Sequence, residues 1–149
     1  MAIRDGELAG LELGFHGPDF YRLRDALTQV SAQLVLGGRA TIPELRALAA
    51  RAEQASYLNA HIPDGAYYVH ALSVPEPLRV HGFGARLLEH AILRAREMGH
   101  RALQLDVLAD NPAVRFYESM GLRVLCETRS PELSLEHGFP SELRMEIRV

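Results

Sequence analysis

The chain has 149 residues, 48% of them hydrophobic, which is enough for one globular domain with a core and too few for two. Sixteen Lys and Arg against nineteen Asp and Glu give a formal net charge of −3, which argues against a protein that binds nucleic acid or an anionic membrane. The one cysteine, Cys126, excludes an internal disulfide and a cysteine-rich zinc site, and we expect it to be a buried small hydrophobic residue. With no long apolar run and a charged start, the sequence predicts a single cytoplasmic domain over residues 1–149.

The N-terminal part of the sequence predicts a β-hairpin followed by a helix. An Asp-Gly pair at 5–6 separates two extended segments, 2–4 and 7–15, and such a pair favours a tight hairpin turn. From 19 to 36 the apolar residues recur at steps of three and four, which predicts an amphipathic helix that ends at the glycines 37–38.

A second helix is predicted directly afterwards. Thr41 followed three residues later by Glu44 is the capping-box pattern, and Pro43 is tolerated in a first helical turn. We expect this helix to run to about Tyr57 and to be followed by a turn at 62–65.

The second half of the sequence predicts alternating strands and helices. A segment rich in β-forming residues on both faces is typical of a central strand covered on both sides. The expected order is a strand over 66–74, a helix that buries Leu87, Leu88, Ala91, Ile92 and Ala95 and ends at Gly99, a strand over 102–108, a short helix from 110–112 through Tyr117 to Gly121, and strands over 122–128 and 143–149 joined by a polar loop.

The segment RVHGFGARLL, residues 79–88, places Gly82 and Gly84 just before one of these helices. Two interpretations are open from this pair alone: a seat for a phosphate group, or a tight turn from strand to helix. The first rests on the unpaired N–H groups and the partial positive charge of a helix N-terminus. A dinucleotide fingerprint and a P-loop both fit poorly, because Leu87 stands where a third glycine is needed and no G-K-[ST] follows.

Two motifs together resemble the GNAT superfamily of acetyl-CoA-dependent N-acetyltransferases. One is R-x-x-G-x-G-A at 79–85 and the other is N-P-A-V-R-F-Y-E-S-M-G-L at 111–122, and the resemblance extends over 66–128. It implies an α/β (α+β) fold in which helices flank a mixed, mostly antiparallel central sheet. Residues 16–62 are then a helical insertion in place of a short link between strands.

The resemblance also implies a site for acetyl-CoA as cosubstrate, with no metal. The backbone of Leu72 and Val74 is expected to pair with the pantetheine arm, as an added strand pairs with an open sheet edge. Asn111 either orients the cofactor or caps a helix, and it lies six residues before Tyr117 where the family pattern has seven. The implied cofactor-binding residues are Leu72, Val74, Arg79, His81, Gly82, Phe83, Gly84, Ala85 and Asn111, and Arg86 is a further candidate for phosphate contact or a solvated surface residue.

Two residues are implied for proton transfer. Tyr117 matches the family tyrosine that donates a proton to the leaving thiolate, and the alternative is a tyrosine that only packs in the core. His70 matches the second histidine of the H-I-H-x-L-A-V strand of arylalkylamine N-acetyltransferases, with Tyr68 in place of the first. Imidazoles titrate near neutral pH and so suit proton removal from an amine, although an isolated histidine in an apolar strand is often a core residue. Strand alternation predicts that Tyr68, His70, Leu72 and Val74 share one face.

One part of the family pattern has no counterpart in this sequence. The family's first strand and helix pair precede the hairpin at 5–6, and the sequence has no room for them. Three explanations stay open: a truncated chain, substitute packing or a substrate lid made by the inserted helices, or a homodimer in which another subunit completes the sheet.

The expected function is therefore an N-acetyltransferase that acts by direct transfer, with His70 as base and Tyr117 as acid. The expected acceptor is a primary amine of a small molecule or peptide, and Glu132 and Glu136 favour a cationic one. The alternatives are a non-catalytic acyl-CoA-binding sensor or interaction module, and a scaffold that keeps only the fold.

Overall fold

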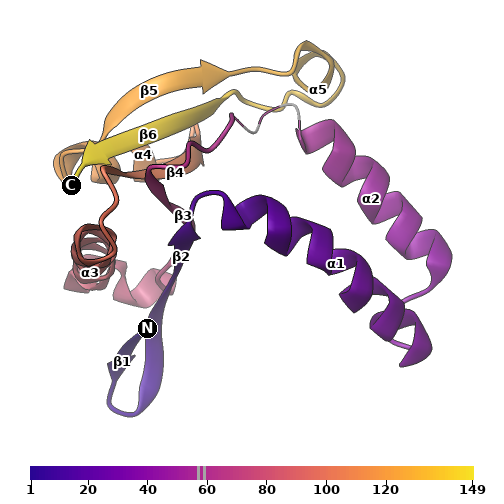
Figure 1. The fold of residues 1–149 in the computed structure, drawn as a ribbon, viewed down its shortest axis with the longest axis horizontal. Coiled ribbons are helices and arrows are strands. Elements are labelled where there is room, and N and C mark those ends of the chain that lie inside the picture. Colours follow the sequence, from indigo (N-terminus) through magenta and orange to yellow (C-terminus); the bar gives the residue numbers. More distant parts are fainter. Residues whose placement is uncertain (57, 59) are drawn as a thin grey trace.

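The structure, a computed structural model, describes residues 1–56, 58 and 60–149 (Figure 1). Its elements in chain order are β1 (Ala2–Arg4), β2 (Glu7–His16), α1 (Asp19–Leu36), α2 (Ile42–Ser56), β3 (Ala66–Ser73), the 3-10 helix η1 (Glu76–His81), α3 (Phe83–Glu97), β4 (Ala102–Leu108), α4 (Ala113–Ser119), β5 (Arg123–Thr128), α5 (Pro131–His137) and β6 (Glu142–Arg148). Most predicted elements are therefore present close to their predicted bounds.

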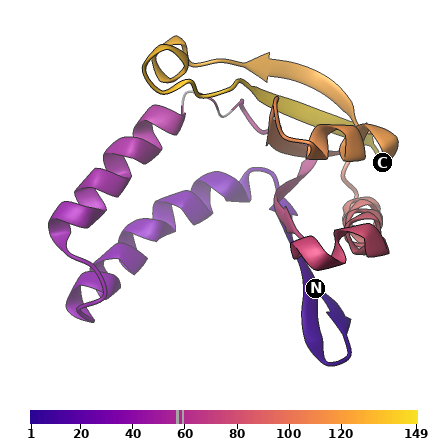
Figure 2. The same ribbon diagram turned by 180° about the vertical axis from the view of Figure 1, so that it is seen from behind.

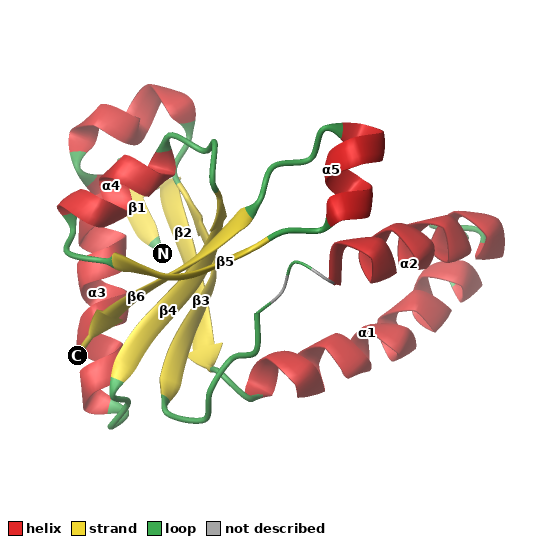
Figure 3. Cartoon of the chain, turned by 90° about the horizontal axis from the view of Figure 1, so that it is seen from above, coloured by secondary structure: helices red, strands yellow, loops and turns green. Residues whose placement is uncertain are grey.

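The strands form one six-stranded sheet in the order β1-β2-β3-β4-β6-β5. Four of the five neighbouring pairs are antiparallel, and only β3 and β4 run parallel. Helices α3 and α4 lie against one face of the sheet, whereas α1 starts on the other face (Figure 3). The expected mixed, mostly antiparallel sheet flanked by helices is confirmed.

The main core lies between the sheet and α3. Alternate residues of β4, among them Leu103 and Leu105, face the buried side of α3, which contributes Leu88 and Ala91. These apolar side chains recur at two-residue steps in the strand and at three- and four-residue steps in the helix, so each element buries one face. A smaller cluster of Ile62, Ala66 and Tyr68 lies with Phe15 and Phe20.

The alternation of β3 is broken at His70. Leu13 of β2 faces Ala71, but the next residue, Gly14, faces Val69, so His70 is an extra residue on β3. Such a β-bulge bends a strand and changes which face the following side chains occupy. The prediction that Tyr68, His70, Leu72 and Val74 share one face is therefore wrong. The rings of Tyr68 and His70 lie beside those of Phe15 and Phe20, whereas Leu72 packs on the α3 core and Val74 lies next to Gly10 and Gly84.

Strands β3 and β4 pair over only part of their length. The pairs run from Ala66 with Ala102 to Val69 with Leu105, and the strands part after the last pair. The first half of β3 is buried and its second half is largely exposed. The central strand is thus covered on both sides only before the bulge, and a gap opens in the sheet beyond it.

The two inserted helices begin as predicted but leave their apolar stripes exposed. The capping box is present, since the Glu44 carboxylate accepts a bond from the Thr41 N–H (2.8 Å) and Thr41 Oγ1 accepts one from the Glu44 N–H (3.4 Å). The predicted end of this helix at Tyr57 lies outside the described residues. Both helices project away from the sheet (Figures 1 and 2), and Leu27 and Leu48 are each 59% exposed.

Three local expectations are wrong. A 3-10 helix, η1, lies between β3 and α3, so Gly84 belongs to α3 and not to a loop. The predicted polar loop before the last strand contains α5, which Ser130 caps by accepting a bond from the Leu133 N–H (3.4 Å). Cys126 is exposed, because β5 is an edge strand that pairs only with β6 and has little cover on its faces.

A buried guanidinium joins several of these elements. Arg144 of β6 donates to both oxygens of Asp106 on β4, with a distance of 2.8 Å from Nη2 to Oδ2. The same group donates to Gln104 Oε1 (3.2 Å) and to the backbone carbonyls of Ala60 (2.6 Å) and His61 (3.0 Å). Tyr68 of β3 donates its hydroxyl to Asp106 Oδ2 at 2.9 Å. The network therefore links β3, β4, β6 and the segment that follows α2.

Replacing Asp106 by Asn should leave the Arg144 charge buried without its counter-charge. The two side chains are only 1% and 7% exposed, so we expect the free energy of unfolding, measured by urea denaturation, to fall by about 3–5 kcal/mol. Glu127→Gln is the control, because it removes the charge of an exposed carboxylate that lies 3.4 Å from Arg129 and keeps an oxygen that can accept the Ser141 hydroxyl, so it should change stability far less. Equal effects of the two substitutions would contradict this account of Asp106.

Candidate functional site

A cavity of about 1190 Å³ lies where β3 and β4 part. Its walls come from the ends of both strands, from η1, from the start of α3 and from the loop and helix α4 that follow β4. Nine of the eleven predicted site residues line it: His70, Leu72, Val74, Arg79, Gly82, Gly84, Ala85, Asn111 and Tyr117. His81 and Phe83 do not line it, and their rings lie next to each other with centroids 6.5 Å apart.

One end of the cavity is formed by the N-terminus of α3. Gly82 has a φ of +76°, a left-handed conformation that glycine adopts without strain. Apart from its two chain neighbours, no described residue has an atom within 4 Å of the place where a Cβ would stand. The first helical bond runs from the Arg86 N–H to the Gly82 carbonyl (3.1 Å), and no side chain among the described residues caps the helix. The N–H groups of Phe83, Gly84 and Ala85 are thus left for an acceptor outside the helix. This arrangement suits a phosphate group.

Gly84 has a different role from Gly82. A Cβ on Gly84 would lie 3.5 Å from the Phe116 ring and 3.9 Å from side-chain atoms of Leu72 and Val74. These are ordinary contact distances, so an alanine would fit at this position and the packing of α3 against α4 and Leu72 does not require glycine. Of the two glycines, only Gly82 is therefore required by the backbone conformation, a difference that the sequence pair alone did not show.

The predicted arginines differ in their placement. Arg79 lines the cavity and donates its Nε to the Val74 carbonyl at 3.2 Å, so part of its side chain is held against β3. The guanidinium also has Nη groups that can reach an anion. Arg86 is exposed and is not part of the cavity wall.

Tyr117 and Asn111 both belong to the cavity wall beside α4. Tyr117 is 8% exposed and belongs to the main core, and its burial raises the pKa of its hydroxyl above the usual 10.0. A raised pKa keeps the hydroxyl protonated at neutral pH, so it can donate a proton. Asn111 Oδ1 accepts a bond from the Ala113 N–H at 2.9 Å, which is the capping role that the sequence left open.

His70 lies on the opposite face of the sheet from the glycines. Its ring centroid is 5.9 Å from that of Phe20 and 6.1 Å from that of Phe15, and the side chain is exposed. The first turn of α1 therefore forms one side of the His70 environment. His70 is not a core residue, because it stands at the bulge where β3 leaves β4.

Two carboxylates in the cavity wall, Asp106 and Glu142, were missed in the sequence analysis. Burial, followed by the negative charge of Asp106, raises the pKa of the Glu142 carboxyl from its usual 4.5 to about 7. The signal that could have found them is the alternation of polar and apolar residues in the last strands. Glu142 and Arg144 alternate with Leu143 and Met145, and Asp106 stands among apolar residues of β4.

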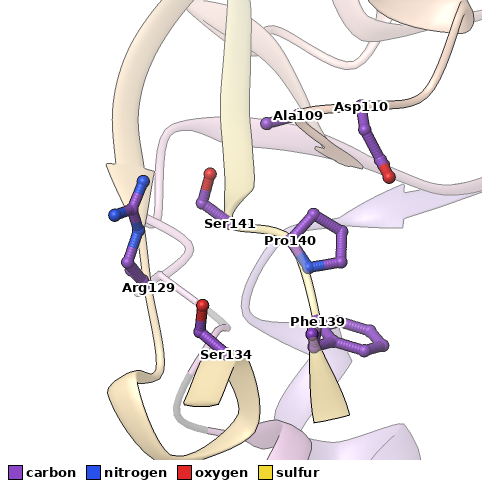
Figure 4. Close-up of a pocket in the computed structure, with 8 residues that line it drawn as sticks. Ala109, Asp110, Arg129, Ser134, Phe139, Pro140 and Ser141 are labelled. Atoms are coloured by element: carbon purple, nitrogen blue, oxygen red, sulfur yellow. The ribbon is translucent and has the colours of Figure 1, made fainter.

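A second cavity of about 430 Å³ lies beside α5 (Figure 4). Arg129 stands on one side of it and Phe139 and Pro140 on the other, with Ser141 between. Asp110 belongs to the walls of both cavities, so they are neighbours. Glu132 and Glu136, expected to favour a cationic acceptor, line neither cavity.

Two negative findings apply to the described part of the chain. Within residues 1–56, 58 and 60–149, no three His, Cys, Asp or Glu side chains are arranged as a metal site. None of the helices described is both long enough and apolar enough to span a bilayer.

Comparisons with known proteins point to one family. A model of the acetyltransferase (GNAT) family matches residues 38–122. An acetyltransferase from Bacillus subtilis, solved in complex with CoA, is 19% identical with a TM-score of 0.51, over 57% of this chain and 62% of that one. An acetyltransferase from Bacillus cereus is 25% identical with a TM-score of 0.49, over 59% of each chain. The ribosomal-protein-S18-alanine N-acetyltransferase from Escherichia coli is 23% identical with a TM-score of 0.49, over 60% of this chain and 57% of that one.

The similarity covers only part of each structure. The chain spans between 57% and 62% of the length of these three proteins. The similarity to the Bacillus subtilis structure is one of fold, and this chain has a partial version of that fold.

The raised pKa of Glu142 predicts a pH-dependent effect of Glu142→Gln on stability. A carboxyl whose pKa is about 7 in the folded chain, against its ordinary value of 4.5, favours unfolding as the pH rises through that interval. We therefore expect the free energy of unfolding of the Gln variant, relative to the original chain, to be higher at about pH 8 than at about pH 5. Urea denaturation at both pH values measures it.

Glu44→Gln is the control for this measurement. Bonds from Thr41 lower the pKa of Glu44 below 4.5, so any change in stability should be the same at about pH 5 and about pH 8. A pH-independent effect of Glu142→Gln would contradict the assignment of Glu142.

Proposed function

Because the chain belongs to the acetyltransferase (GNAT) family, we propose that it transfers an acetyl group from acetyl-CoA directly to a primary amine of a small molecule or peptide. The observation that carries the proposal is the cavity between β3 and β4, which brings the N-terminus of α3, Tyr117 and His70 into one site. We also propose that residues 1–149 form a single domain. The proposal that the protein acts in the cytoplasm rests on its cysteine usage alone.

The residues present fit the CoA part of the cosubstrate. The open N–H groups at the start of α3 and the absence of a Cβ at Gly82 make room for the pyrophosphate, with the Nη groups of Arg79 nearby in the wall. Leu72 lies on the stretch of β3 that has no partner on the β4 side among the described residues, and Val74 follows directly after the end of β3. Their free backbone groups are proposed to pair with the pantetheine arm, and the Val74 carbonyl keeps its bond from Arg79.

The proposed proton transfers use one residue on each side of the gap. Acetyl-CoA supplies an activated acetyl thioester when bound. Tyr117, kept protonated by its burial, donates its hydroxyl proton to the departing sulfur. His70 accepts a proton from the attacking amine, and its place at the bulge leaves its ring exposed to an amine arriving from the α1 side. Asn111, which caps the turn before α4, keeps Tyr117 in position.

Binding of CoA is tested by a pair of variants at Gly82. Both Asp and Asn tolerate the left-handed conformation, so Gly82→Asp and Gly82→Asn differ mainly in charge. We expect Gly82→Asp to weaken the affinity for CoA and acetyl-CoA by about tenfold or more, because its carboxylate repels the pyrophosphate, and Gly82→Asn to weaken it much less. Isothermal titration calorimetry measures both. Equal losses would show a steric effect of the side chain, and no binding to the original chain would contradict the proposal.

The catalytic assignments are tested with Tyr117→Phe and His70→Gln. Each removes one proton-transfer group and should lower kcat by about a hundredfold or more while leaving the affinity for acetyl-CoA unchanged. Acetyl transfer to a panel of primary amines is measured by detecting the free thiol that the reaction releases. Saturable binding of acetyl-CoA by the original chain and by both variants, with no transfer to any amine, would favour the alternative of a non-catalytic acyl-CoA-binding sensor or interaction module.

A further inference from the structure

The face of the cavity opposite the α3 core carries two carboxylates. In the β4–β6 register, Asp106 faces Arg144 and Leu108 faces Glu142. Glu142 and Arg144 are two residues apart on β6 and so point to the same side of the sheet. Asp106 receives its bond from Tyr68, which places both carboxylates on the side occupied by Tyr68 and His70. They therefore lie on the side where the acceptor amine is proposed to arrive.

The two carboxylates differ in their partners. Asp106 accepts bonds from the Arg144 guanidinium at both oxygens and a further bond from Tyr68, so its charge is compensated within the protein. Glu142 Oε2 is buried, and no residue in the described part of the chain donates a hydrogen bond to it. Asp106 is therefore paired with Arg144, whereas Glu142 has an oxygen to which no described residue donates.

A buried carboxylate oxygen without a donor is unfavourable unless a ligand supplies one. Glu142 lines the large cavity, so a ligand that enters the cavity lies beside its side chain and can bond to Oε2 once the carboxyl group turns toward it. A primary ammonium group carries a positive charge and three N–H donors, which is what the unpaired oxygen lacks. A ligand with a carboxylate next to its amine would instead bring a negative charge close to Glu142 and Asp106.

We propose that Glu142 binds the ammonium group of the acceptor amine, and that the acceptor is a primary amine without a carboxylate on the carbon that bears it. This inference rests on the proposed function, because it names the acceptor of that site. Once bound, the ammonium gives one proton to His70. One N–H bond of the ammonium breaks, one N–H bond forms on the imidazole, and the acceptor nitrogen keeps the electron pair with which it attacks.

Amine binding can be measured without acetyl-CoA or turnover. The full chain is labelled with carbon-13 at its glutamate carboxyl groups, and the Glu142 resonance is identified as the one missing in Glu142→Gln. Butylamine and norvaline amide are the probes, and norvaline is the matched amine that carries a carboxylate. We expect both probes to shift the Glu142 resonance and to lower the pKa of this carboxyl, and norvaline to have little effect.

The Glu146 resonance is the internal control. Glu146 lies on the same face of β6, accepts a bond from Gln104 at 2.6 Å and is not part of the cavity wall. A Glu142 resonance that no probe shifts, or that norvaline shifts as much as its amide, would overturn the proposal. Because this experiment contains no acetyl-CoA, its outcome is independent of the CoA titration and of the transfer assay.

A kinetic comparison separates substrate binding from a structural role. With any amine that the transfer assay identifies, Glu142→Gln should raise the KM for the amine by about tenfold or more, change kcat far less, and leave acetyl-CoA affinity unchanged. Glu146→Gln makes the same chemical change four residues further along β6 and should leave that KM unchanged. Equal changes in both variants would assign Glu142 a structural role and overturn the proposal.

Discussion

The Arg144 guanidinium is the group on which the position of the whole site depends. A buried positive charge must have all its donors satisfied, and its acceptors come from β4 and from the carbonyls of Ala60 and His61. Arg144 thereby fixes β6 against β4 and attaches the end of the helical insertion to the sheet. Tyr68 of β3 bonds to the same Asp106 carboxylate, one residue beyond the last β3–β4 pair. The network thus closes the sheet at the point where the two strands begin to part.

Beyond this point the geometry of β3 determines what the site can do. The bulge at His70 turns Leu72 and Val74 toward α3 while His70 stays on the other face. Since β3 lacks a partner on its β4 side after Val69, its backbone groups there need partners from a ligand or from water. The cavity is consequently lined from both faces of the sheet. The proposed acid, Tyr117, is on the core face, and the proposed base and acceptor-binding carboxylate are on the other.

The sequence predicts the elements of this fold better than their packing. The period of the apolar residues predicts α1 and α3 alike, because both are amphipathic, yet α3 buries its stripe and α1 leaves Leu27 exposed. Periodicity reports that a helix has an apolar side and not what covers that side. Cys126 shows the same limit, since its exposure follows from the edge position of β5, which only the strand order reveals.

The candidate site divides in the same way between what is local and what is not. Gly82 can be predicted because one residue in a left-handed conformation before a helix is a local feature with a known residue preference. The bulge at His70 depends on the register between β2 and β3, so a rule of strict alternation placed four side chains on one face when they occupy two. The inserted helices between β2 and β3 do not disturb that register, because β2 and β3 still pair directly.

Charge is the property that sequence composition describes least well at this site. Nothing in the letters Asp106 and Glu142 says that one carboxylate is compensated and the other is not, because the compensation comes from Arg144 across a strand pair. The formal net charge of −3 belongs to the whole chain, whereas the charged residues that line the cavity are Arg79, Asp106, Asp110 and Glu142, of which Asp106 is paired with Arg144. The Arg144 guanidinium that stabilises the junction of β3, β4 and β6 thus bonds to Asp106 and leaves Glu142, a lining residue of the cavity, with one buried acceptor. A ligand that brings its own donors relieves that unfavourable burial.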